Sequence, residues 1–172
     1  MHHQAGIHKG LTRALKDMAH DGLSADSMIS IPAGQVQSFD QDLQRGGQRV
    51  KTVLLVEDEP LNALFLKEVI RDTSSEKKQV RVIHVTMGEE AIKICRNTKI
   101  DLVLMDIRLP SMDGLEALRE IKQSDPQIPV IVETAYAFPE DRDRALRSGC
   151  DAYMAKPISL SLLHHMITKY LD

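Results

Sequence analysis

Acidic, hydroxyl and basic side chains lie where several largely apolar segments of the chain end. Glu57 and Asp58 follow TVLLV, Asp106 ends DLVLMD, Thr134 ends IPVIVET, and Lys156 follows DAYMA. If these segments are strands of one parallel sheet, their carboxyl ends meet at one edge, where open α/β sheets bind their ligands. We therefore expect a site that gathers three carboxylates, a hydroxyl and an ammonium.

The chemistry of this set points to phosphoryl transfer. Three crowded carboxylates repel each other unless a cation lies among them. Oxygen-only ligands suit Mg²⁺. The Lys156 ammonium and the Thr134 hydroxyl would bind oxygens of a phosphoryl group, whose transfer needs such charges and donors. Asp106 is then the candidate nucleophile, which would form an aspartyl-phosphate.

A plainer interpretation competes for each residue taken alone. A single acid at the end of a strand is more often a helix cap or a solvated turn residue, and we assign Asp113 and Asp141 to that class. The second apolar segment ends in His84, Val85 and Thr86, which suggest no chemistry. It is the recurrence of suitable polar residues at the other four segment ends that favours a functional site.

The segments that must position these residues alternate between strand-like and helix-like patterns. The sequence predicts strands over 52–58, 79–85, 101–106, 128–134 and 151–155, and helices over 60–72, 88–97, 113–124, 139–149 and 159–172. Strands that are apolar on both faces and alternate with helices are typical of a parallel sheet covered on both sides. The predicted fold class is α/β.

Composition divides the 172 residues into an extension and one domain. Six of the nine glycines lie at or before Gly47, and apolar clustering begins only at Val50. We expect an extension over 1–48, with one short helix and a linker, and a domain over 49–172. The net charge of −3 argues against nucleic acid or a membrane surface as the main partner. No apolar run approaches the roughly 18 residues that span a bilayer, so we expect a cytoplasmic protein.

Four segments resemble the receiver domain of two-component response regulators. They are VLLVEDEPLN, DLVLMDIRLPSMDGLEALREIK, IPVIVETAYA and SGCDAYMAKPI, and the resemblance covers about residues 52–171. It is nearest to receivers that are attached to hybrid histidine kinases or serve them, and it implies a flavodoxin-like doubly wound sheet with strand order 2-1-3-4-5. Glu133 departs from the family, in which an apolar or neutral residue is commoner at this position. Residues 1–48 show no resemblance, and we expect a stand-alone receiver because no output domain follows Asp172.

The resemblance implies a role for each residue of the site. Asp106 would accept the phosphoryl group from a phosphohistidine of a sensor histidine kinase or a histidine phosphotransfer protein. Asp58, Asp106 and the backbone carbonyl of Arg108 would bind Mg²⁺, with Glu57 acting mainly through water. Lys156 and Thr134 would bind phosphoryl oxygens. The chain would catalyse only its own phosphorylation and dephosphorylation, and would not be an enzyme in the wider sense.

The resemblance also implies a switch. Tyr153 would turn inward when Thr134 moves, and the Lys156–Pro157 bond would be cis, a minority state for such bonds. The surface formed by the predicted elements at 139–149, 151–155 and 159–172 would signal to a downstream protein, without direct contact to nucleic acid or a membrane.

Two further side chains are placed to control hydrolysis of an aspartyl-phosphate. Arg108 lies two residues after Asp106, and Tyr136 two residues after Thr134, so both are candidates to govern the approach of water. Two alternatives stay open. One is an interaction module that keeps the receiver fold but docks constitutively. The other is a phosphatase related to the haloacid dehalogenases, which usually carry a second aspartate where this chain has Arg108.

Overall fold

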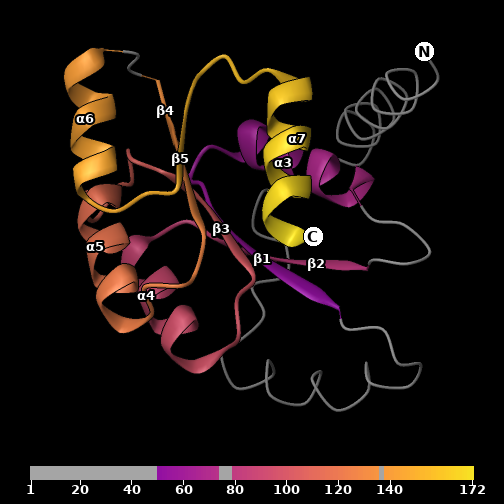
Figure 1. Cartoon of the computed structure of the whole chain (residues 1–172), viewed down its shortest axis with the longest axis horizontal. Helices are drawn as coiled ribbons and strands as arrows, with labels where there is room; N and C mark the ends of the chain where they lie inside the picture. Colours follow the sequence, from indigo (N-terminus) through magenta and orange to yellow (C-terminus); the bar gives the residue numbers. More distant parts are fainter. Residues whose placement is uncertain (1–49, 74–78, 136–137) are drawn as a thin grey trace, which may run out of the picture. The chain divides into compact units, whose positions relative to one another are not determined.

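The computed structural model describes residues 50–73, 79–135 and 138–172. The predicted extension over 1–48 and Tyr136 lie outside the described residues. The described part forms five strands and five helices (Figure 1). In chain order they are β1 (Lys51–Val56), α3 (Pro60–Asp72), β2 (Val80–Val85), α4 (Gly88–Asn97), β3 (Leu102–Asp106), α5 (Gly114–Ser124), β4 (Val130–Thr134), α6 (Pro139–Arg147), β5 (Ala152–Ala155) and α7 (Leu160–Leu171). None of these helices is both long enough and apolar enough to cross a membrane.

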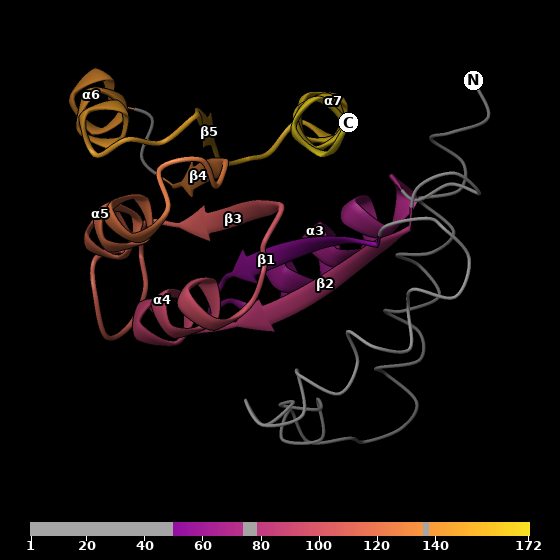
Figure 2. The same cartoon turned by 60° about the horizontal axis from the view of Figure 1, so that its bottom comes forward.

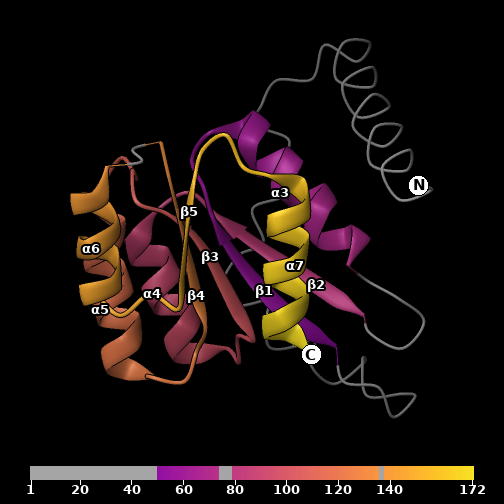
Figure 3. The same ribbon diagram turned by 45° about the horizontal axis from the view of Figure 1, so that its top comes forward.

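The five strands pair in parallel in the order β2-β1-β3-β4-β5, which confirms the predicted α/β fold and strand order. Helices α4, α5 and α6 cover one face of the sheet (Figure 2), and α3 and α7 lie side by side on the other (Figure 3). Every residue of β3 and β4 is buried, because both faces of these central strands are covered. This explains their nearly continuous apolar sequences.

Acidic side chains near the carboxyl edge of the sheet stabilise the first turns of several helices. Glu59 caps α3 by accepting hydrogen bonds from two backbone N–H groups of its first turn. Asp113 caps α5, and its carboxylate accepts from the Leu115 N–H at 2.9 Å, as its assignment to structural roles predicted. Asp141 lies in the first turn of α6 and pairs with Arg144 at 3.6 Å. These acids therefore serve the helices that leave the edge.

Two glycines are required by the backbone around them. A Cβ at Gly114 would lie 2.3 Å from the carbonyl oxygen of Asp106, so only glycine lets the chain return so closely over the end of β3. Gly149 has a φ of 97° and lies just after α6, which ends at Arg147 rather than at the predicted residue 149. The positive φ directs the chain out of α6 and toward β5.

Candidate functional site

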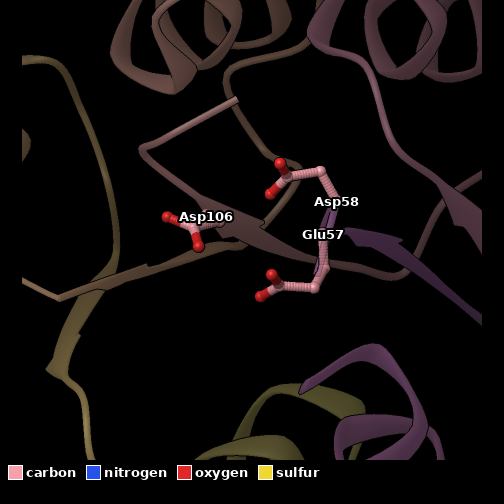
Figure 4. A group of neighbouring side chains, drawn as sticks. All are labelled: Glu57, Asp58 and Asp106. Atoms are coloured by element: carbon pink, nitrogen blue, oxygen red, sulfur yellow. The ribbon is translucent and has the colours of Figure 1, made fainter. Parts of the chain in front are cut away.

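The three predicted carboxylates meet at the carboxyl edge of the sheet. Val56 at the end of β1 pairs with Met105 of β3, so Glu57 and Asp58 emerge beside Asp106. Each of the three residues offers an oxygen within 4.8 Å of the others (Figure 4). Glu57 and Asp106 are buried, with 1% and 6% of their surface exposed, whereas Asp58 is exposed. A hard cation that prefers oxygen ligands, such as Mg²⁺, fits this donor set and could reach it from the solvent side.

Lys156 joins two of these acids. Its Nζ donates to Oε2 of Glu57 at 3.0 Å and to Oδ2 of Asp106 at 2.5 Å. Burial alone would lower the pKa of Lys156, but the hydrogen bonds to Asp106 and Glu57 outweigh that effect and raise the pKa. The ammonium is therefore the cation that offsets the two buried carboxylates. The Lys156–Pro157 bond that follows is cis, as predicted.

Backbone and side-chain donors hold the same two carboxylates in fixed orientations. The Arg108 N–H donates to Oδ1 of Asp106 at 2.8 Å. The Glu59 N–H donates to Oε1 of Glu57 at 3.1 Å, and the Asn62 amide donates to Oε2 of Glu57. The carboxylate of Asp106 is thus oriented by one backbone donor and one ammonium before any ligand is present.

The structure describes three of the remaining predicted residues, namely Thr134, Arg108 and Tyr153. Thr134 is buried at the end of β4, and its carbonyl accepts a hydrogen bond from the Lys156 N–H at 2.7 Å. Arg108 is exposed and forms an isolated antiparallel bridge with Asp113. Tyr153 of β5 is partly buried and packs against the core cluster under α4, α5 and α6. Tyr136 is outside the described residues.

His84 is a residue of the site that the sequence did not reveal. Its Nε2 lies 2.8 Å from the carbonyl oxygen of Glu57, and its Nδ1 lies 3.0 Å from Nζ of Lys67 on α3. The strand alternation carried a signal, because His84 shares a face of β2 with Val80 and Val82, which pack in the core under α3 and α7. An imidazole on that face must find polar partners.

Glu133 is a fourth carboxyl next to the site. It pairs in register with Asp106 on the adjacent strand and is 1% exposed, so both side chains lie on the same face of the sheet. Neither carboxyl oxygen of Glu133 has a hydrogen-bond partner among the described residues. Burial raises the pKa of Glu133 to about 8; the Lys156 charge opposes this rise, and the charges of Glu57 and Asp106 add to it. Glu133 is accordingly protonated at neutral pH.

This buried acid predicts a specific dependence of stability on pH. Between about pH 4.5 and pH 8 the folded chain keeps a proton on Glu133 that the unfolded chain releases, so stability falls as pH rises through this range. Glu133→Gln removes the titration. The difference in unfolding free energy between variant and wild type should move in favour of the variant by up to about 5 kcal/mol from pH 4.5 to pH 8.

Urea denaturation in the presence of a chelator, monitored by circular dichroism at several pH values between about 4.5 and 8, would measure the difference in unfolding free energy between the variant and the wild type. Glu116→Gln, on an exposed position of α5, is the matched control and should show no such trend. If the difference in unfolding free energy between Glu133→Gln and wild type stays constant with pH, Glu133 is charged in the folded chain over the whole pH range tested.

Comparison with known proteins places these features in a family. The model of the response regulator receiver domain matches residues 53–168. The polar-differentiation response regulator DivK of Brucella anthropi is 38% identical over 123 residues, which are 70% of this chain and 96% of that protein.

Solved structures agree with the sequence comparison. The receiver domain of sensor histidine kinase PA1611 from Pseudomonas aeruginosa, whose structure has a magnesium ion coordinated in the active site cleft, is 32% identical with a TM-score of 0.64. The match covers 72% of this chain and 98% of that one. A CheY-like receiver domain protein from Methanospirillum hungatei is 30% identical with a TM-score of 0.62, covering 72% of this chain and 95% of that one.

Proposed function

The chain belongs to the response regulator receiver domain family, and from this premise we propose that it accepts a phosphoryl group on Asp106 from a phosphohistidine. The donor would be a sensor histidine kinase or a histidine phosphotransfer protein. One observation carries the proposal. Asp106 is a buried carboxylate held between two further acids and a lysine ammonium, at the edge where parallel sheets bind ligands.

The proposed reaction is an in-line displacement at phosphorus. An Asp106 carboxylate oxygen forms the new O–P bond, the P–N bond to the donor imidazole breaks, and the freed nitrogen takes a proton from water. Lys156 already contacts Asp106, and its ammonium would offset negative charge on the transferred group. The Arg108 N–H keeps the carboxylate in place, which lowers the entropic cost of reaching the reactive geometry. The hydroxyl of Thr134, at the end of β4, would donate a hydrogen bond to another phosphoryl oxygen.

Magnesium is the proposed cofactor, and the oxygen donors of the site fit it. Asp58, Asp106 and the backbone carbonyl of Arg108 would hold the ion, with Glu57 acting through water. When bound, the ion supplies positive charge to the phosphoryl oxygens. The magnesium ion in the receiver of PA1611 supports this assignment.

Phosphorylation would be read out on the surface formed by α6, β5 and α7. Thr134 pairs with Ala155 in the sheet, and Tyr153 lies two residues earlier on the same strand. A displacement of Thr134 toward a phosphoryl oxygen would open space for the Tyr153 ring, and a partner protein would sense the change. In this proposal the chain acts as a switch or relay and catalyses only its own phosphorylation and dephosphorylation.

A labelling experiment tests the proposed function. The full chain is incubated with phosphoramidate, a small donor that carries phosphoryl on nitrogen, in the presence of Mg²⁺ or of a chelator. Intact mass spectrometry should show one added phosphoryl group with Mg²⁺ and none with chelator, and hydroxylamine should remove it, as expected of an acyl phosphate. Equal labelling under both conditions would contradict a magnesium-dependent site. Repeated turnover of p-nitrophenyl phosphate would instead favour a phosphatase, and a chain that accepts no phosphoryl group would favour a constitutive interaction module.

A further inference from the structure

A chain of two hydrogen bonds connects helix α3 to the backbone of the acid cluster. Lys67 on α3 contacts Nδ1 of His84 at 3.0 Å, and Nε2 of His84 contacts the carbonyl oxygen of Glu57 at 2.8 Å. The imidazole is partly buried between α3 and β2. Both contacts are short enough for well-formed hydrogen bonds.

The two partners fix the tautomer of His84. A carbonyl oxygen can only accept, so Nε2 must carry the proton and donate it to Glu57. The Lys67 ammonium can only donate, so Nδ1 must be the unprotonated acceptor. Burial lowers the pKa of His84, which favours the same neutral ring, although the hydrogen bond to the Glu57 carbonyl acts in the opposite direction. Lys67 therefore selects the ring form that can donate to Glu57.

The carbonyl of Glu57 lies where the sheet no longer supports the backbone. The paired register of β1 and β2 ends at Val56 and Val85, and the Glu57 N–H makes the next contact, donating to the Val85 carbonyl at 3.1 Å. His84 supplies the hydrogen-bond donor for the carbonyl group of Glu57. The carbonyl belongs to the peptide that joins Glu57 to Asp58, so its orientation sets the directions in which the two carboxylates leave the strand.

We propose that His84, oriented by Lys67, is a positioning residue that fixes the Glu57–Asp58 peptide and thereby sets the distance of Asp58 from Asp106. This inference rests on the proposed magnesium site, because the geometry of the three acids matters most when one ion must contact them together. Partners that hold ligand residues in place commonly change metal affinity when they are removed.

Four single variants test this role. His84→Leu removes both hydrogen bonds, whereas His84→Gln keeps a donor that can reach Glu57. Lys67→Met leaves the ring without its orienting partner, and His165→Leu, on an exposed position of α7, is the matched control. Isothermal titration calorimetry gives the Mg²⁺ affinity of each, and urea denaturation in chelator gives its stability. Imidazole ¹⁵N shifts in chelator report the tautomer without any metal.

We expect the Nε2–H tautomer in the wild type and a loss of Mg²⁺ affinity of about 10-fold in His84→Leu. Lys67→Met should show a smaller loss, and His84→Gln should recover most of the wild-type affinity. The double variant His84→Leu, Lys67→Met should bind no more weakly than His84→Leu alone, because Lys67 acts only through the imidazole.

Two results would overturn the positioning role. One is His84→Leu binding Mg²⁺ as tightly as wild type while losing stability, which is the pattern of a purely structural residue. The other is additive losses in the double variant. If His84→Leu does not fold, the Mg²⁺ affinities of His84→Gln and Lys67→Met, together with the tautomer of His84 in the wild type, still test the positioning role. A wild-type chain that binds no Mg²⁺ would overturn the proposed metal site itself, a result distinguishable from failure of the positioning role alone.

Discussion

Asp106→Asn should abolish phosphoryl incorporation while leaving the domain folded. The amide has nearly the shape of the carboxylate but is a poor nucleophile, so the O–P bond cannot form at a useful rate. Lys156 contacts both Glu57 and Asp106 in the wild type, and in the variant it retains Glu57 as a charged partner. Because one buried negative charge is removed from beside Glu57, the unfolding free energy in chelator should stay the same or increase.

The measurement is the phosphoramidate labelling described above, combined with thermal denaturation of the same samples. Asp113→Asn is the matched control, since it makes the same chemical change in the loop that follows Asp106, and asparagine also caps helices well. The control should be labelled at the wild-type rate. Labelling of Asp106→Asn at that rate would show that another residue is the acceptor.

Lys156→Met should strongly destabilise the domain. Methionine fills much of the space of the lysine stem but leaves Glu57 and Asp106 without their shared ammonium. Both carboxylates are almost completely buried, and removing one partner from a buried ion pair costs about 3–5 kcal/mol. We expect a loss of this size in the unfolding free energy at neutral pH with chelator present.

Magnesium separates the charge effect from a packing effect. An ion that binds only the folded state stabilises it by mass action, and it would replace part of the missing positive charge. The gain in melting temperature on adding Mg²⁺ should therefore be larger for Lys156→Met than for wild type, although labelling should be strongly reduced in the variant. Lys99→Met, at an exposed position, is the control and should match the wild type. A Lys156→Met variant as stable as wild type in chelator would show that the two acids are not both charged.

The sequence predicted the fold well because the elements are strongly patterned. The apolar runs at 101–106 and 128–134 become the fully buried strands β3 and β4. The acids were also placed correctly at the edge, since parallel strands end together and the order of strands brings β1 beside β3. The buried strands and the acids at their ends follow from periodicity, which one sequence displays directly, whereas the strand order was implied by the resemblance to receiver domains.

Contacts that join different elements could not be predicted in the same way. His84 was judged to have no chemical role, because its partners Lys67 and Glu57 lie 17 and 27 residues away and only the packing of α3 on β2 brings them together. Glu133 was noted as unusual, but its burial with no hydrogen-bond partner in the described part of the chain depends on the covering of that face by α3 and α7. Such details depend on side-chain packing, which periodicity does not encode.

The ion pair between Lys156 and Glu57 can form only late in the synthesis of the chain. The lysine is synthesised 99 residues after Glu57 and 50 residues after Asp106. A nascent chain that already contains β1 to β3 therefore holds both acids without Lys156, the ammonium that contacts them in the finished domain, and burying them without it would cost free energy. Domains fold as units during synthesis. The ribosome must release β5 before the carboxyl edge of the sheet can close, so a product truncated before Lys156 would keep this edge open to solvent and to proteolysis.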